Sequence, residues 1–322
     1  MTATRAPERI VVVGAGAIGA SVGALLFESG VSCVLVARGE HGRALAAAGV
    51  SLRFPDTARV VRVPTAASLV DASPTPRDLV LVATMGHDTA RALDGIDPAI
   101  TVASFQNGVA PLETIADRGH PTLAAMVYVP AERREPGVIA LPGVPAVGAV
   151  LVGAWPKGEG AFARWLVERL ASAGFRAEGD ADVGPWIRAK LLVNLGGILA
   201  AVCDAPVEDV AAVARDEGRA VFHALGERFE EIEALLERIG PLELAAVDGR
   251  ARVGGSTRSA LARGDGLLET VTLHGSIVTR GRAAGIPTPV NEALVRLAHD
   301  AVRGRWRPGA LDAATVRAAV RC

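Results

Sequence analysis

One stretch near the start of the chain, residues 9–38, constrains the fold more than any other. Its four apolar residues at 10–13 predict a buried parallel strand, and glycines follow in the spacing G-x-G-x-x-G. A helix is predicted from Ala17 onward, and a second strand over residues 33–37. This strand–turn–helix–strand order is the context that a dinucleotide-binding glycine motif requires. We therefore expect an α/β fold with a doubly wound parallel sheet.

Each glycine of the motif has its own expected role. Gly14 allows the tight turn, Gly16 lets the backbone approach a pyrophosphate, and Gly19 lets helix and strand pack closely. The helix opens at Ala17 and Ile18, and its first turn offers free N–H groups and the positive end of the helix dipole to phosphates. Outside this context the same motif would indicate only a glycine-rich turn.

The residue that ends the second predicted strand distinguishes NADP(H) from NAD(H). NAD-binding chains usually carry an acid there that accepts from the ribose 2′-OH, whereas an arginine suits a 2′-phosphate. This position holds Arg38, and no acid precedes it in the strand. A guanidinium is always charged and binds phosphate in a bidentate way. We therefore expect NADP(H), with the alternative that Arg38 is a surface residue beside Glu40.

Composition argues against several classes of protein. A formal net charge of −1 without a basic block argues against a nucleic-acid partner. Cys33, Cys203 and Cys322 are scattered, which predicts neither a disulfide framework nor a metal site and fits a reducing compartment. The N-terminal residues lack the apolar core of a signal peptide, and the apolar runs are too short for a membrane span. We expect a soluble, cytoplasmic protein without a membrane partner.

The predicted elements change in kind near residue 180. Before it, strands are predicted over 60–63, 79–83, 100–105, 123–129, 138–141 and 147–152, and helices over 40–48 and 161–173. After it, nearly everything predicts helix: 186–203, 208–239, 267–284 and 290–302. We expect a Rossmann-type NADP-binding domain over residues 1–180 and an all-helical substrate and catalytic domain over 181–322. The amphipathic stretch 219–239 is a candidate surface for a homodimer.

A rare lysine is the strongest candidate for chemistry. Of the 34 basic residues only Lys157 and Lys190 are lysine, and lysine can lose its proton where arginine cannot. Lys190 and Asn194 lie four apart in a predicted helix and so share one face. Apolar neighbours would desolvate the amine and lower its pKa. Lys190 can then protonate a carbonyl oxygen as hydride reaches the carbon; the alternative is a lysine that snorkels at a helix edge.

Further polar candidates lie in loops. Ser256 and Thr257 form a hydroxyl-bearing loop near a helix start, which can bind a carboxylate. Glu269 lies near the start of the next predicted helix, where it can serve a site or simply complement the helix dipole. Asn107 follows the strand predicted over 100–105, at the edge where open α/β sheets bind ligands. These groups are therefore candidates for contact with a small-molecule substrate or the cofactor, with a purely structural role as the alternative.

Taken together, the motifs resemble those of the ketopantoate reductases (2-dehydropantoate 2-reductases). The matching segments occur in the family's order along nearly the whole chain: GAGAIGA at 14–20, Arg38, QNG at 106–108, KLLVN at 190–194, the ST…LLE segment, and GIPTPVNEAL at 285–294. The glycine motif is generic, whereas the lysine–asparagine helix and the GIPTPVN segment are much more specific.

This resemblance implies an NADPH-dependent reduction of a 2-keto acid to a 2-hydroxy acid, as in pantothenate biosynthesis. It implies that Lys190 is the general acid, acting with Asn194 and Glu269, and that Asn107 and Glu269 lie beside the nicotinamide end of the cofactor. The residues implied to surround the substrate have polar side chains in common: Asn107, Asn194 and Ser256 or Thr257.

Three regions depart from the family pattern. The usual lysine and glutamine before the QNG strand are Met85 and Asp88, the region of a second asparagine is Gly197 and Ile198, and a late-helix asparagine is His274. These changes remove partners for an acidic substrate. Two alternatives therefore stay open: a related NADPH-dependent reductase of another ketone or an imine in secondary metabolism, or a non-catalytic NADP(H)-binding sensor.

Overall fold

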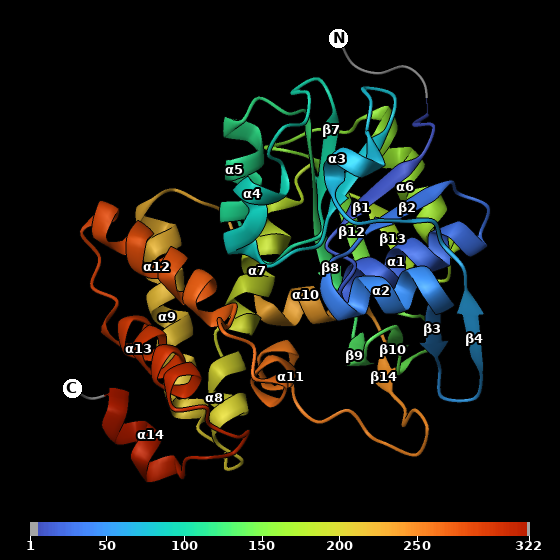
Figure 1. The fold of residues 1–322 in the computed structure, drawn as a ribbon. Helices are drawn as coiled ribbons and strands as arrows, with labels where there is room; N and C mark the ends of the chain where they lie inside the picture. The colour runs from blue at the N-terminus through green and yellow to red at the C-terminus, as the bar shows by residue number, and fades with distance from the viewer. Residues whose placement is uncertain (1–5, 321–322) are drawn as a thin grey trace. The chain divides into compact units, whose positions relative to one another are not determined.

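The computed structural model describes residues 6–320 of the chain. Two compact units form (Figure 1): the first contains the residues up to Gly184 together with Leu236–Arg252, and the second contains Pro185–Leu235 together with the residues from Val253 onward. The domain boundary expected between residues 180 and 181 stays a prediction. The contacts do assign one later segment, Leu236–Arg252, to the first unit.

The first unit is built on an eight-stranded sheet in the order β13-β12-β8-β7-β6-β1-β2-β5. The strands from β8 to β5 are all parallel, and their order is that of a doubly wound dinucleotide-binding sheet. β12 is antiparallel to β8 and parallel to β13. The strands are β1 (Ile10–Val13), β2 (Cys33–Val36), β5 (Thr65–Ala66), β6 (Leu79–Val82), β7 (Thr101–Ser104), β8 (Thr122–Tyr128), β12 (Ala149–Ala154) and β13 (Arg176–Gly179).

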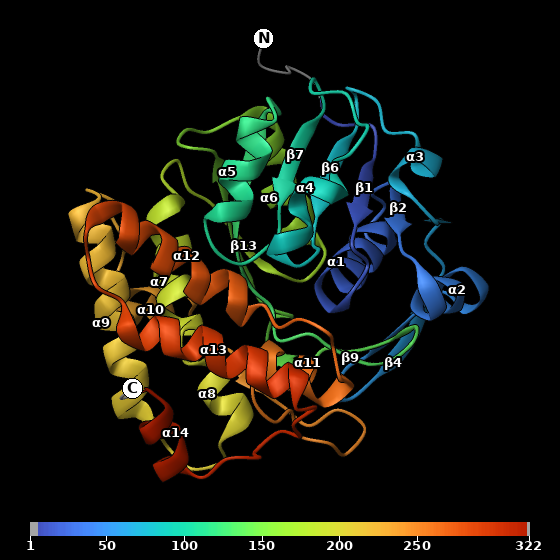
Figure 2. The same ribbon diagram turned by 60° about the vertical axis from the view of Figure 1, so that its left-hand side comes forward.

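Helices cover both faces of this sheet (Figure 2), which explains the continuous apolar runs of its strands. Ile10 and Val12 enter the core on one face, and Val11 and Val13 enter the core on the other. The covering helices are α1 (Ala17–Glu28) and α6 (Ala161–Ser172) on the first face, and α3 (Leu69–Ala72), α4 (Thr89–Ala92) and α5 (Ala110–Asp117) on the second. The expected α/β class is confirmed.

A smaller sheet with the order β4-β3-β10-β9 packs on the first face. Leu52 and Ile139 point from it into the shared core and are fully buried. Its strands, and the helix that precedes them, are β3 (Val50–Arg53), β4 (Ala58–Val61), β9 (Glu132–Glu135), β10 (Val138–Ala140) and α2 (Gly39–Ala48). Only parts of this sheet were expected, because β3 and β9 carry polar residues rather than an apolar run.

Leu236–Arg252 completes the first unit. Within it β14 (Glu243–Leu244) pairs antiparallel with β11 (Gly143–Val144), so the part of the chain after residue 180 is not entirely helical. Arg176 also donates from Nη1 to the Ile239 carbonyl at 2.8 Å. The segment therefore belongs to the first unit through strand pairing and through side-chain hydrogen bonds.

The second unit is a helical assembly around its own apolar core. Its helices are α7 (Gly184–Asn194), α8 (Gly197–Val202), α9 (Glu208–Ala224), α11 (Ser256–Arg263), α12 (Thr270–Ala284), α13 (Pro289–Arg303) and α14 (Ala313–Val320), with α10 (Ile232–Ile239) leading back to the first unit. The helical character of the C-terminal domain is confirmed.

Two of the expected long helices are broken. The helix predicted over 208–239 ends at Ala224, and Gly226 takes a φ of +67°, a left-handed value that ends helices. The continuous 219–239 helix proposed for a dimer contact is therefore wrong, and the homodimer itself stays a prediction. The helix predicted over 186–203 is likewise interrupted, at residues 195–196, between α7 and α8.

Other surface and composition features bear on the expected partners. One helical stretch, Gly184–Val202, is long and apolar enough to cross a membrane by length and composition, and 56% of it is buried within the protein.

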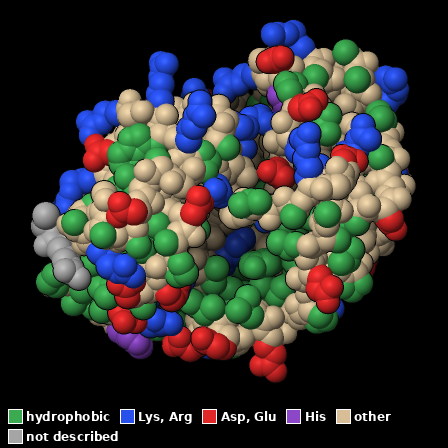
Figure 3. Space-filling view, turned by 90° about the horizontal axis from the view of Figure 1, so that it is seen from below, with side chains coloured by type: hydrophobic (Ala, Val, Ile, Leu, Met, Phe, Trp, Pro, Cys, Tyr) green, Lys and Arg blue, Asp and Glu red, His purple; other side chains and the backbone are tan. Residues whose placement is uncertain are grey.

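Two of the three cysteines, Cys33 and Cys203, are buried free thiols, and Cys322 lies outside the described residues. Burial raises the pKa of Cys33 to about 12. Positive and negative side chains are intermixed on the face shown in Figure 3.

Candidate functional site

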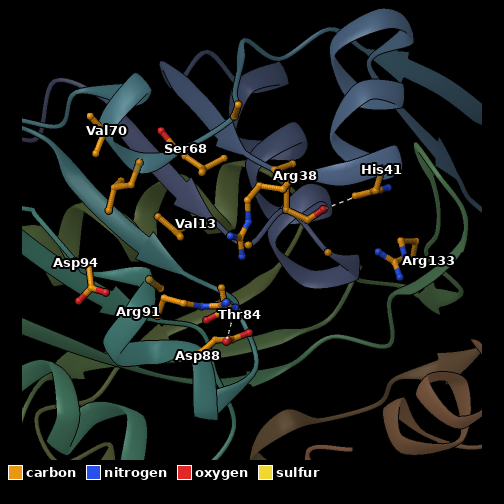
Figure 4. Close-up of a pocket in the computed structure, with 18 residues that line it drawn as sticks. Val13, Arg38, His41, Ser68, Val70, Thr84, Asp88, Arg91, Asp94 and Arg133 are labelled. Atoms are coloured by element: carbon orange, nitrogen blue, oxygen red, sulfur yellow. Dashed lines mark hydrogen bonds and ion pairs between the residues drawn. The ribbon is translucent and has the colours of Figure 1, made fainter. Parts of the chain in front are cut away.

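A pocket of about 340 Å³ opens in the first unit where β1, β2 and β6 end. The lining comes from the glycine turn, from Arg38 and His41, from the Ser68 loop and from Thr84 (Figure 4). β1 lies between β2 and β6, so this is the point at which the strand order reverses. Open α/β sheets bind their ligands there, at the carboxyl ends of the strands.

The glycines of the motif meet three different steric demands. Gly14 has a φ of +90°, and a Cβ on it would lie 2.7 Å from the Thr84 backbone nitrogen. A Cβ on Gly19 would collide with the Gly14 carbonyl oxygen, because helix α1 packs directly on the turn. A Cβ on Gly16 would meet no protein atom within 4 Å, and Gly16 lines the pocket. Space for a ligand therefore lies where the sequence predicts a pyrophosphate.

Arg38 is an exposed residue that lines this pocket and sits at the N-cap of α2. Its guanidinium extends between the two ends of the pocket, with Val70 and Asp94 at one end and His41 and Arg133 at the other (Figure 4). A cationic side chain and the start of a helix both favour an anion at this position. The pocket therefore suits a phosphate group near the end of β2.

Gln106 has a structural role at the site that the sequence analysis did not identify. It is 7% exposed, and its amide donates to the Thr84 carbonyl at 3.1 Å and to Thr89 Oγ1 at 2.9 Å. It thereby joins the end of β7 to the loop after β6. Its neighbour Asn107 is half-buried and does not line the pocket. Gln106 stands in the QNG motif, but the sequence does not show which loop its amide would contact.

His41 also joins two segments beside the pocket. Gly137 donates its backbone N–H to Nδ1 at 2.9 Å, so that nitrogen carries no proton. Nε2 lies 2.6 Å from the Ala15 carbonyl oxygen and must be the donor in that bond. The neutral ring therefore links the glycine turn to the β9–β10 turn. Its sequence position, in an otherwise ordinary helix, carried no signal of this role.

Two further arginines line the pocket. Arg91 of α4 forms an ion pair with Asp88 at 2.6 Å, near Thr84 (Figure 4). Arg133 comes from β9 in the smaller sheet. The sequence analysis missed both residues, because neither lies in a recognisable motif and the second sheet was only partly expected.

The remaining predicted site residues belong to the second unit. Lys190 and Asn194 share one face of α7 and are half-buried, whereas Leu191, Leu192 and Leu195 enter the core. Lys190 and Asn194 therefore lie in one helix at the four-residue spacing that the sequence predicts, beside apolar neighbours. The catalytic role of the lysine stays a prediction.

The late candidates differ in environment. Thr257 is 8% exposed, and its Oγ1 would lie 3.0 Å from a Cβ on Gly197, so it packs against the start of α8. Ser256 begins α11 and is exposed. Glu269 is the half-buried N-cap residue of α12, where a carboxylate complements the helix dipole. Both of the roles considered for Glu269 therefore stay open.

Comparison with known proteins identifies the family to which both units of the chain correspond. Residues 10–157 match the family described as "Ketopantoate reductase PanE/ApbA", and residues 182–302 match "Ketopantoate reductase PanE/ApbA C terminal". The 2-dehydropantoate 2-reductase of Mycobacterium tuberculosis is 32% identical over 308 residues, which cover 89% of this chain and 96% of that protein. The chain belongs to the ketopantoate reductase family.

Other relatives agree with this assignment. The 2-dehydropantoate 2-reductase of Archaeoglobus fulgidus is 28% identical over 90% of this chain and 96% of its own length. The alignment with that of Pyrococcus horikoshii is shorter, at 31% identity over 58% of this chain and 60% of the relative. As a member of the family, this chain is an oxidoreductase that acts on a C=O or CH–OH group with a pyridine nucleotide.

Solved structures share the two-part fold. A ketopantoate reductase from Ralstonia eutropha superposes with a TM-score of 0.74 at 27% identity, covering 92% of this chain and 99% of that one. D-mandelate dehydrogenase, solved with NADH and anilino(oxo)acetate, superposes with a TM-score of 0.76 at 21% identity, covering 92% of this chain and 99% of that one. The second likeness concerns the fold alone.

Proposed function

We propose that this chain is an NADP(H)-dependent reductase that converts a 2-keto acid to a 2-hydroxy acid, in the manner of ketopantoate reduction to pantoate. The observation that carries the proposal is the position of Arg38, which lines the same pocket as Gly14 and Gly16. A ribose 2′-OH needs an acceptor at the end of β2, whereas this position offers a permanent cation.

The residues of the pocket fit such a cofactor. Gly16 leaves open space beside the first turn of α1 for a pyrophosphate, and Arg38 can bind a 2′-phosphate. When bound, the cofactor supplies a hydride to the carbonyl carbon of the substrate. Lys190 gives a proton from its Nζ to the carbonyl oxygen, which becomes the new hydroxyl.

Two of the departures from the family pattern, Ile198 and His274, give little support to a non-catalytic role, because both residues are buried in the second unit. Ile198 is fully buried in the apolar core of the second unit, and His274 is 1% exposed and bonded to Asn291. Both changes therefore alter core packing rather than an exposed polar surface. Asn107, Asn194 and Ser256 or Thr257 remain as proposed partners of the substrate.

The cofactor assignment is tested with Arg38→Gln in the full chain. We expect the Kd for NADPH to rise at least about tenfold while the Kd for NADH stays within about twofold, because only NADPH carries the 2′-phosphate. Fluorescence titration measures both constants. Equal losses for the two cofactors would contradict a phosphate contact, and a wild-type preference for NADH would overturn the choice of NADP(H).

The catalytic assignment is tested with Lys190→Ala. We expect kcat to fall by at least about a hundredfold with the Kd for NADPH unchanged, because general acid catalysis contributes on this scale. Lys157→Ala is the matched control, since the other lysine is 65% exposed and pairs with Asp182 at 3.0 Å. The two variants should differ in kcat and agree in thermal unfolding.

A panel of substrates separates the alternatives. NADPH oxidation is followed with aliphatic and aromatic 2-keto acids, simple ketones and cyclic imines. Turnover restricted to 2-keto acids supports the proposal, and turnover restricted to ketones or imines favours the related reductase. Tight NADPH binding without oxidation of any compound, or full activity in Lys190→Ala, rejects the catalytic role.

A further inference from the structure

An arginine of the smaller sheet contributes to a pocket that otherwise belongs to the large sheet. Arg133 lies on β9 and lines the pocket together with Arg38 and His41 (Figure 4). β9 is far from the glycine motif in sequence and is not one of the strands of the doubly wound sheet. The side chain reaches the pocket because the β9–β10 turn packs beside α2, where Gly137 meets His41.

An irregularity in strand pairing separates Arg133 from its neighbour. Val138 pairs with Glu135 and Ile139 pairs with Arg133, so the register shifts across Arg134. Such bulges redirect side chains and are common beside functional sites. Arg134 donates from Nη1 to the Val247 carbonyl at 2.8 Å and from Nη2 to the Arg250 carbonyl at 3.3 Å. Arg134 therefore binds backbone carbonyls of the 236–252 segment, whereas the adjacent Arg133 lines the pocket.

His41 fixes the place of this turn relative to the glycine motif. Its ring accepts from Gly137 and donates to Ala15, so a short chain of two hydrogen bonds runs from the β9–β10 turn to the phosphate-binding turn. Burial chiefly, and the charge of Arg133 in addition, lower the pKa of His41. The ring therefore stays neutral and keeps both bonds.

Positive charge lines the pocket from its middle to the end where His41 lies, which favours an anion there. The guanidinium of Arg38 lies between the two ends of the pocket, Arg133 lies at the His41 end (Figure 4), and the first turn of α2 adds a positive dipole end. The carboxylates in the lining are Asp88, which pairs with Arg91, and Asp94, which lies at the opposite end in Figure 4. A phosphate monoester carries close to two negative charges at neutral pH, which matches two guanidinium groups.

We propose that Arg133 is a second specificity-determining residue, binding the 2′-phosphate of NADP(H) together with Arg38. This inference rests on the proposed function, because it presumes that the pocket holds a 2′-phosphorylated dinucleotide. It adds a contact from the smaller sheet, so cofactor preference depends on the β9–β10 turn as well as on the end of β2.

The test compares Arg133→Gln, Arg133→Lys and Arg38→Gln in the full chain. Calorimetry measures Kd for NADPH, NADH, adenosine 2′-monophosphate and adenosine 5′-monophosphate. We expect Arg133→Gln to raise Kd about tenfold for NADPH and for the 2′-monophosphate, and by less than about twofold for the other two. Arg133→Lys should lose less, because it keeps the charge. Arg134→Gln, which removes the same charge one residue away, should leave the NADPH/NADH ratio unchanged.

The outcomes separate this inference from the proposed function. A wild-type chain without a preference for NADPH overturns both. A preference that Arg38→Gln abolishes and Arg133→Gln preserves overturns the inference alone. Equal losses for NADPH and NADH in Arg133→Gln, or the same change of their ratio in Arg134→Gln, also overturn it, because they indicate a structural or a long-range charge effect.

Discussion

His274 shows how a single buried ring can make the stability of the second unit depend on pH. Asn291 donates its amide to Glu217 and to the Ala214 carbonyl, so its Oδ1 must accept from His274 Nδ1 at 2.7 Å. The ring is neutral in this arrangement, and its Nε2 is buried without a hydrogen-bond partner in the described structure. Burial lowers the pKa of His274 to about 4.

Stability should therefore fall as the medium becomes acidic. The folded pKa lies below the unfolded value near 6.5, so the contribution of His274 is complete above pH 6.5 and is lost as pH falls toward 4. Its size is at most about 3 kcal/mol. Urea unfolding midpoints at several pH values measure it. His274→Gln should be less stable at neutral pH but should show a shallower acid dependence; an equal slope would contradict the assignment.

At the scale of elements, a carboxylate in the α9–α10 connection holds two helices of the second unit together. Glu227 accepts from Arg188 of α7 at 3.0 Å and also from Arg280 of α12. All three side chains are less than a fifth exposed. Removal of the acid would leave two poorly solvated guanidinium groups without their shared acceptor.

Glu227→Ala should consequently lower the stability of the second unit by about 2 kcal/mol. Glu231→Ala is the matched control, because Glu231 is 56% exposed in its pair with Arg219 and should contribute less than about 1 kcal/mol. Thermal unfolding of both variants and the wild type provides the comparison. Similar losses of stability in the two variants would show that burial does not make the ion pairs of Glu227 stronger than the exposed pair of Glu231.

The elements that the sequence predicts well are those with strong local signals. The apolar run of β1, the glycine spacing and the start of α1 at Ala17 appear where expected. β9 and β13 were missed because their sequences, ERRE and RAEG, carry no apolar alternation and form strands only through their neighbours. The break after Ala224 was missed because the helical pattern continues through Gly226.

At the scale of the whole molecule, the grouping of Leu236–Arg252 with the first unit can be measured. Leu81→Ala creates a cavity in the core beside β6 and should destabilise the first unit by about 3 kcal/mol. Hydrogen exchange should then accelerate in β1, β6 and the 236–252 segment more than in α12 and α13. Leu294→Ala in the second core should reverse this pattern. If hydrogen exchange in residues 236–252 instead changed together with that in α12 and α13, the grouping would be contradicted.

Some residues of the candidate site can be identified from their own segment of sequence, whereas others reach the site only because distant segments pack together. The position of Arg38 in the pocket was predictable because it follows from its place at the end of one strand. Arg133 and His41 were not, because their roles depend on a bulge in β9 and on the packing of the β9–β10 turn beside α2. The sequence therefore identifies the pocket residues of the large sheet more readily than those that the smaller sheet and its neighbours contribute.

The pairing of β11 with β14 also bears on how the chain is completed during translation. β11 ends at Val144, but its partner strand begins only at Glu243. On the ribosome, the nascent first unit therefore has an unpaired edge until the residues of α7, α8 and α9 have also emerged. Those helices in turn lack α11, α12 and α13 at that moment. The first unit is therefore completed only after several helices of the second unit have already been synthesised.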